Sequence, residues 1–181
     1  MNPEFSKFRA AVQKHGIILD TNILILYIVG LTSPDKISQN KKTSRYDYRH
    51  LDFIKGLVSI CKGRKPIITP HLLPEVDHML SLSSNKASST SKSRYLEAAI
   101  HVIKGANEIN VPAKCIMNNQ AFIRFGATDI SIMELAKNGY AVLTDDLILS
   151  DCLKRMKISA MTFDDYNAAE YNAKHQILGS I

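Results

Sequence analysis

Short apolar runs that stop at an acidic residue are the feature that most constrains the fold of this 181-residue chain. Residues 16–19 (Gly-Ile-Ile-Leu) end at Asp20, before a second apolar run begins, and residues 141–144 (Ala-Val-Leu-Thr) end at Asp145 and Asp146. Continuous apolar runs of this length are typical of strands buried in a parallel sheet. Because ligands and metals collect at the carboxyl ends of such strands, these acids are expected at one functional edge.

Strand and helix patterns alternate along most of the chain. Strands are expected at residues 16–20, 66–70, 140–144 and 159–163, and helices at residues 1–15, 22–30, 51–61, 71–82, 95–104, 129–139 and 147–156. Asn22 is a good N-cap and is expected to begin the second helix. Residues 109–112 favour an extended piece, and residues 115–125 show no clear period. The alternation predicts an α/β fold with three layers, in which helices cover both faces of a central parallel sheet.

The chain length suits a single domain spanning residues 1–181, with two segments that depart from the pattern. A Ser-rich segment at residues 83–93 has almost no apolar content and is expected to be a loop. A basic insertion at residues 32–50 interleaves cations with aromatic rings, a composition that can hold phosphates and stack bases. A solvated loop explains the same composition equally well. The candidate nucleic-acid-binding residues of the insertion are Lys41, Lys42, Arg45, Tyr46 and Arg49.

Composition favours a soluble protein that binds a polyanion. Lys and Arg number 23 against 17 Asp and Glu, for a formal net charge of +6. A basic surface attracts nucleic acid with an affinity that falls as salt rises. No apolar run approaches the roughly 20 residues of a membrane span, and the first residues lack the features of a secretory signal. The three cysteines suggest neither a disulfide framework nor a zinc cluster. A cytoplasmic location is therefore expected.

Acidic residues at four positions form a candidate metal site: Asp20, Glu75, Asp129 and the pair Asp145 and Asp146. Mg²⁺ and Mn²⁺ prefer hard oxygen ligands, so carboxylates without Cys or His suit them. Gathered carboxylates would repel one another and raise at least one pKa, and a divalent ion would remove that cost. Taken singly, each acid also has an ordinary explanation, as a helix cap or a solvated helix residue.

Three stretches of the chain resemble the PIN-domain nucleases, metal-dependent enzymes that cut single-stranded nucleic acid. Residues 17–22 (Ile-Ile-Leu-Asp-Thr-Asn) are similar to the first motif of that family, and residues 68–76 to the second. The stretch from Thr128 to Asp146 resembles the third and fourth motifs run together. The resemblance covers about residues 16–163 and implies a PIN-like fold.

The resemblance also implies roles for individual residues. Asp20, Glu75 and Asp129 match the first three acids of the family, and Asp146 matches the fourth, although the neighbouring Asp145 leaves that choice open. In the expected site, Asp20, Glu75, Asp129 and Asp146 are catalytic, and all five acids including Asp145 are candidate ligands for Mg²⁺ or Mn²⁺. Asn22 and Thr144 are expected to support them.

The function implied by this resemblance is a metal-dependent endoribonuclease that hydrolyses single-stranded RNA. Compact members of the family are often toxins held by an antitoxin, so a regulatory protein is an expected partner, and a homodimer is a further expectation. Two alternatives remain open: a non-catalytic PIN-like module that binds RNA or protein, and a DNA-directed nuclease of the same fold. A phosphatase with a strand-end Asp nucleophile is disfavoured, because it would want a second acid where Asn22 stands.

Overall fold

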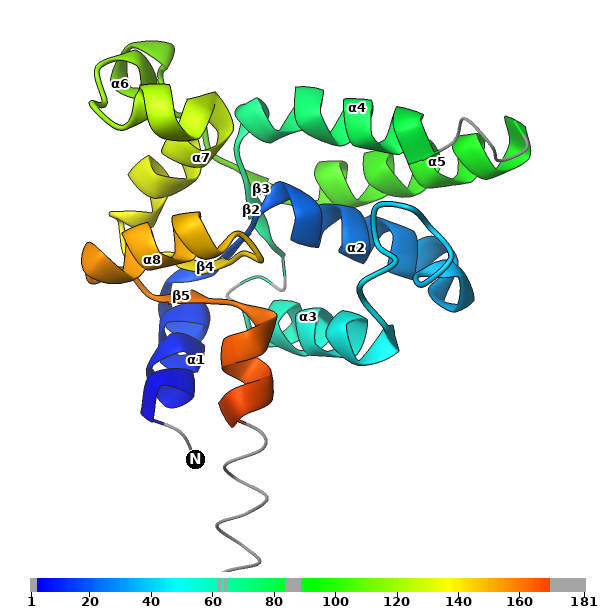
Figure 1. Ribbon diagram of the computed structural model, residues 1–181, viewed down its shortest axis with the longest axis horizontal. Coiled ribbons are helices and arrows are strands. Elements are labelled where there is room, and N and C mark those ends of the chain that lie inside the picture. The colour runs from blue at the N-terminus through cyan, green and yellow to red at the C-terminus, as the bar shows by residue number, and fades with distance from the viewer. Residues whose placement is uncertain (1–2, 62, 64, 84–88, 170–181) are drawn as a thin grey trace, which may run out of the picture.

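A five-stranded sheet organises the computed structural model, which describes residues 3–61, 63, 65–83 and 89–169 (Figure 1). The strands are β1 (Ile17–Leu19), β2 (Ile67–Ile68), β3 (Asn107–Glu108), β4 (Ala141–Leu143) and β5 (Ala160–Met161). They lie in the order β3-β2-β1-β4-β5, and every neighbouring pair is parallel. The prediction of an α/β fold with a central parallel sheet is confirmed.

Helices pack around this sheet. They are α1 (Pro3–His15), α2 (Thr21–Thr32), α3 (Tyr48–Ile60), α4 (Leu73–Ser83), α5 (Ser89–Gly105), α6 (Ala113–Met117), α7 (Phe122–Ala136) and α8 (Leu147–Arg155), with short 3₁₀ turns η1 (Pro34–Lys36) and η3 (Pro70–Leu72). Residues 163–169 are also helical. In Figure 1, α1 and α3 lie below the strands whereas α4 and α5 lie above them, an arrangement compatible with three layers. No helix in the described ranges is long and apolar enough to cross a membrane.

The core explains why the first and fourth strands are continuous apolar runs. All three residues of β1 and all three of β4 are buried, because these central strands are covered on both faces. Helix α2 follows β1 and contacts α3, α4 and α5, so its aliphatic side chains are buried on almost every side. The residues that follow β1 and β4 are therefore attached to fully buried strands.

The second helix differs from its predicted boundaries at both ends. It begins at Thr21 with Asp20 as its N-cap, so the prediction that Asn22 caps it is wrong. It also continues past Gly30 to Thr32. Gly30 lies inside the helix and faces α3. A Cβ at this position would stand 2.6 Å from Leu51 Cδ1, so the absence of a side chain permits α2 and α3 to approach closely.

The segments with little apolar pattern contain the other differences. The expected loop at residues 83–93 is wrong where it is described, because Ser83 belongs to α4 and α5 begins at Ser89; residues 84–88 lie outside the described residues. The third strand consists of the exposed Asn107 and Glu108 rather than residues 109–112. It has no apolar signature, because it pairs with β2 at the edge of the sheet.

The basic insertion packs onto the fold rather than extending into solvent as a loop. Ile37, Thr43 and Tyr46 are buried, and the Thr43 hydroxyl donates a hydrogen bond of 2.6 Å to the Ile37 carbonyl oxygen. Helix α3 begins at Tyr48, three residues before its predicted start. Most of the charged side chains of the insertion remain exposed around this buried anchor.

Candidate functional site

The strand order reverses between β1 and β4. The chain runs from β1 outward to β2 and β3, and then returns to β4 on the other side of β1. Leu19 pairs with Leu143, and the backbone N–H of Asp20 donates to the Leu143 carbonyl oxygen at 3.0 Å. Crevices that bind ligands in open α/β sheets lie at such a reversal, outside the carboxyl ends of the strands. The acids that follow β1 and β4 lie at this position.

Asp20 is buried at the centre of the reversal, with 5% of its surface exposed. Its Oδ1 accepts a hydrogen bond of 2.6 Å from the backbone N–H of Thr21, and its Oδ2 accepts one of 2.8 Å from the Thr144 hydroxyl. Burial raises the pKa of Asp20 to about 6; the two hydrogen bonds lower this pKa, and the charges of Glu75 and Asp146 raise it. Asp20 thus caps α2 and also takes part in a wider group of carboxyls.

Glu75 reaches the same place from the first turn of α4. Its Oε2 accepts a hydrogen bond of 2.8 Å from the hydroxyl of Thr21, the residue next to Asp20. Glu75 is half-buried, whereas Asp77, two residues further along the helix, is exposed. The structure therefore separates these two acids of α4, and only Glu75 is tied to the end of β1.

Asp129 lies in α7 and shares a pocket of about 500 Å³ with Glu75. Burial, the largest cause, and the charges of Asp20, Asp146 and Glu75 together raise the pKa of Asp129 to about 7. An interruption of α7 at Gly126 precedes Asp129 by three residues; its φ of 77° is in the region that favours glycine. The helix resumes beyond this break and carries Asp129 to the pocket.

Asp146 and Asp145 have different surroundings, which the sequence could not distinguish. Asp146 Oδ1 accepts hydrogen bonds from the backbone N–H groups of Ile148 at 2.7 Å and Leu149 at 3.0 Å, so Asp146 caps α8. Its charge also acts on Asp20 and Asp129. Asp145 Oδ2 instead accepts from the Tyr46 hydroxyl at 3.0 Å and lies 3.3 Å from Arg45 Nη2. The structure therefore groups Asp146, rather than Asp145, with the other acids.

Thr144 joins two of these acids. Besides donating to Asp20, its hydroxyl oxygen accepts a hydrogen bond of 3.0 Å from the backbone N–H of Asp146. The side chain is fully buried, and its bond to Asp20 is buried with it, whereas the bond from Asp146 is only partly buried. Asn22, the other expected supporting residue, lies half-buried in the first turn of α2, next to Thr21.

The carboxyls of Asp20, Glu75, Asp129 and Asp146 interact through their charges, but they do not converge on one point. Among the described residues, no group of three or more His, Cys, Asp and Glu side chains forms a ready metal cluster. The acids can affect one another's pKa without forming a metal cluster, because charges act over longer distances than the roughly 2 Å of a metal–oxygen bond. Mg²⁺ usually keeps several waters and binds one or two carboxylates directly, so this looser group of hard oxygen donors suits it.

The insertion residues split into buried and exposed members. Tyr46 is 3% exposed, and its ring contacts those of His50 and Phe163 edge-on. Tyr46 therefore has no open face for a base, and the structure removes it from the expected nucleic-acid-binding residues. Arg45 lies over the Tyr46 ring, 4.8 Å from its centroid, with 55% of its side chain exposed. Lys41 is exposed and Lys42 half-buried.

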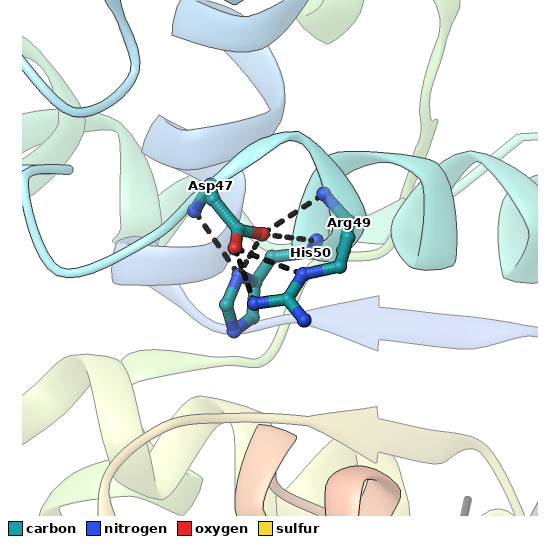
Figure 2. A network of polar contacts seen from close by, with 3 residues as sticks. All are labelled: Asp47, Arg49 and His50. Atoms are coloured by element: carbon teal, nitrogen blue, oxygen red, sulfur yellow. Dashed lines mark hydrogen bonds and ion pairs between the residues drawn. The ribbon is translucent and has the colours of Figure 1, made fainter.

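Arg49 belongs to a separate polar network at the start of α3 (Figure 2). Its Nε and Nη2 donate to Asp47 Oδ2 at 3.0 and 2.7 Å, while His50 Nδ1 lies 2.9 Å from Asp47 Oδ1. The bonds from Arg49 are the main cause that lowers the pKa of Asp47 to about 2. Arg49 thus pairs with Asp47 as Arg45 pairs with Asp145, so both arginines of the insertion already contact a carboxylate.

The structure shows contacts of the site that the sequence did not indicate. Thr21 holds Glu75, and Tyr46 holds Asp145, across 54 and 99 positions of the chain. Phe125 lines the pocket with Glu75 and Asp129, and the Arg124 guanidinium lies 5.2 Å from the centroid of its ring. Gly126 is the sequence signal that could have indicated the break in α7 before Asp129, because a Gly often interrupts a helical pattern.

Comparisons with protein-family models, with curated proteins and with solved structures found no match to this chain. The candidate site therefore depends on its own geometry and on the motifs quoted above.

Proposed function

We propose that this protein is a metal-dependent endoribonuclease that hydrolyses single-stranded RNA. The observation that carries the proposal is the group of Asp20, Glu75, Asp129 and Asp146 at the strand reversal, in which burial and mutual repulsion raise the pKa of Asp20 and of Asp129. Four acids close enough to repel one another destabilise the folded protein, and a bound cation would offset that repulsion. Perturbed carboxyls in a crevice are typical of functional sites.

The donor set supports Mg²⁺ or Mn²⁺ as the cation. The residues that would hold it are Asp20, Asp129 and Asp146, with Glu75 as a ligand or a group that orients water. When bound, such an ion supplies an activated water and neutralises charge on the phosphoryl oxygens and the leaving oxygen. The acids of this chain then need to be deprotonated, which the cation itself favours.

Neighbouring threonine hydroxyls fix the orientation of two of the acids. The Thr144 hydroxyl orients Asp20 and the Thr21 hydroxyl orients Glu75, at 2.8 Å in each case. Hydrogen bonds of this kind fix metal-binding carboxylates in one rotamer and tune their basicity. The same bonds would hold the carboxylates still while a phosphodiester group approaches.

The pocket beside the acids favours a single strand. Phe125 offers an aromatic ring next to Glu75 and Asp129, and Arg124 offers an exposed guanidinium above that ring. An unpaired base can stack on such a ring while the cation contacts phosphate, whereas a base in a duplex is already stacked. This feature supports a single-stranded substrate over a double-stranded one.

The PIN-like motifs also support inferences about the location, the regulation and the oligomeric state of the enzyme. We infer a cytoplasmic enzyme with a PIN-like fold that a regulatory protein of the antitoxin kind restrains and that forms homodimers. An unrestrained ribonuclease harms its own cell, so expression of the active enzyme without its partner is expected to slow growth. Harmless overexpression of active protein, with no copurifying partner, would contradict this part of the proposal.

The proposal is tested by incubating labelled single-stranded RNA with wild type, Asp20→Asn and Asp129→Asn in Mg²⁺, Mn²⁺ or EDTA. Asp77→Asn serves as the matched control, because Asp77 is an exposed acid of α4 outside the group. Cleavage is expected for wild type and Asp77→Asn with metal, and its loss in EDTA and in both site variants. Binding without cleavage in every condition would indicate a non-catalytic module, and a preference for single-stranded DNA would indicate a DNA-directed enzyme.

A further inference from the structure

A second pocket lies at the opposite edge of the sheet from the acids. It has a volume of about 530 Å³ and is lined by residues that come just before four strands. Lys14 and His15 end α1 before β1, Lys65 precedes β2, Asn107 begins β3, and Asn138 and Tyr140 precede β4. The amino ends of neighbouring parallel strands therefore bring these side chains together from distant parts of the sequence.

The lining of this pocket includes basic and polar side chains. Among the described residues, Lys14 and Lys65 line the pocket, and no Asp or Glu does. Neither lysine forms an ion pair within the part of the chain that the structure describes. An anion bound in the pocket would interact favourably with both ammonium groups. Asn107 and Asn138 add amide groups that can donate hydrogen bonds to the same anion.

The position of His15 is set by its packing against a glycine. A Cβ at Gly139 would stand 3.2 Å from two atoms of the His15 ring, so the absence of a side chain there makes room for the imidazole. Gly139 also has a φ of 93°, which an L side chain rarely adopts. The imidazole therefore packs against the Gly139 backbone and lines the pocket.

Stabilisation of α1 accounts for only part of this arrangement. Lys14 and His15 lie in the last turn of α1, where cations favour the negative end of the helix dipole. Lys65, Asn107 and Asn138 come from three other segments and do not serve that helix end. The convergence of all five residues on one hollow needs a further explanation.

We propose that this amino-edge pocket binds a phosphate group, carried either by a small phosphorylated molecule or by a nucleic-acid strand. A pocket of this size holds a ligand of nucleotide dimensions, since ligand pockets range from roughly 300 to 1,000 Å³. Lysine binds phosphate as a point charge, and amide donors complete the coordination of the oxygens. This site is separate from the acid group and does not depend on the proposed nuclease activity.

The test measures binding of inorganic pyrophosphate and of short single-stranded RNA to the full chain, by titration calorimetry in EDTA at two salt concentrations. The variant is the double substitution Lys14→Gln and Lys65→Gln. Both lysines are exposed, so the variant is expected to keep the wild-type Tm. Lys55→Gln is the matched control, because Lys55 is an exposed lysine of α3 outside the pocket.

The double substitution is expected to weaken binding about tenfold or more, the effect of losing charge-assisted hydrogen bonds, whereas Lys55→Gln keeps the wild-type affinity. If pyrophosphate shows this loss, the ligand is a small phosphorylated molecule. If only RNA shows it, with a salt slope reduced by about 1.4, the ligand is a strand. Equal affinities of wild type and double variant for both probes, or an equal loss in Lys55→Gln, would overturn the proposal. Because EDTA removes metal from the acids, the result is independent of catalysis.

Discussion

At the scale of single residues, the candidate site works against the stability of the folded protein. Asp20 and Asp129 have pKa values of about 6 and about 7 in the fold, against an ordinary value of 3.8. Burial is the largest cause for both residues, and repulsion from neighbouring acids adds to it. Each carboxyl is therefore easier to protonate in the folded chain than in the unfolded chain, so the folded state binds more protons between these pKa values.

Stability of the metal-free protein is consequently expected to fall as the pH rises from about 4 to about 7, where these two carboxyls lose their protons.

Asp129→Asn removes one of the buried charges, so it should raise the free energy of unfolding at neutral pH by roughly 1 to 2 kcal/mol, after allowance for partial exposure. The gain should vanish near pH 4, where wild-type Asp129 is neutral. Thermal unfolding in EDTA across this pH range measures both effects. An Asp129→Asn variant less stable than wild type at neutral pH would contradict the account, and Asp77→Asn should show no such gain.

Thr144 is the residue whose hydroxyl orders the site. Thr144→Val keeps the shape of the side chain but leaves Asp20 Oδ2 and the Asp146 N–H without this partner. Unfolding free energy should fall by about 1 to 3 kcal/mol, the cost of unpaired buried polar groups. Metal affinity should fall about 10- to 100-fold, as for other lost supporting hydrogen bonds, and Thr144→Ser should restore most of it.

The control for Thr144 is Thr162→Val, which removes another buried hydroxyl. The Thr162 hydroxyl accepts a hydrogen bond of 3.1 Å from the backbone N–H of Asp165, a bond that involves none of the four acids. This variant should lose stability while keeping metal affinity. Equal losses of metal affinity in the two valine variants would mean that Thr144 acts only through stability.

At the scale of elements, α8 begins at an acid that has two separable roles. Asp146 caps the helix by accepting two backbone hydrogen bonds, and it also contributes charge to the acid group. Asn is as good an N-cap as Asp, so Asp146→Asn should keep the Tm while RNA cleavage falls steeply. Asp146→Ala should lose about 1 kcal/mol of stability in addition. Cleavage and thermal unfolding of both variants measure this, and full activity of Asp146→Asn would exclude Asp146 from the site.

The elements also show what could be predicted from the sequence and why. The buried strands β1 and β4 and the helices α1 and α8 follow directly from apolar period and position, because burial there imposes a clear pattern. The predicted N-cap of α2 was wrong because Asp20 and Asn22 both suit that position. In the fold the helix begins at Thr21, so Asp20 is the N-cap. Helix α5 begins at Ser89, within a segment whose composition favours a loop. Tertiary contacts, which local propensity does not contain, decide such cases.

The contacts of the site residues were likewise predictable only where they depend on local sequence pattern. The acids at the ends of β1 and β4 were predictable as neighbours of one sheet edge, because alternating strands and helices predict parallel strands whose carboxyl ends lie on the same side. The order of the strands was not predictable in this way. The tie between Tyr46 and Asp145 was not, since it joins residues 99 positions apart through one hydrogen bond. An aromatic ring in a basic segment reads as a surface feature until packing is known, and here the ring lies in the core.

At the scale of the whole molecule, the parallel sheet separates charge. The carboxyl edge carries the acids that follow β1 and β4, and the amino edge carries the pocket with Lys14 and Lys65. The net charge of +6 is therefore a balance between an acidic site and a more basic remainder. Long-range attraction of a polyanion to that remainder would be weakened by salt.

The most direct test of the acid site is Mn²⁺ titration calorimetry near pH 6.5 in two buffers of different ionisation enthalpy. Wild type is expected to bind Mn²⁺ and to release about one proton, because Asp20 and Asp129 are partly protonated at this pH and metal binding requires carboxylates. Asp129→Asn should bind more weakly and release fewer protons, and Asp77→Asn should match wild type. Absence of Mn²⁺ binding by wild type, or binding that Asp129→Asn leaves unchanged in affinity and proton release, would contradict a metal site built from these acids.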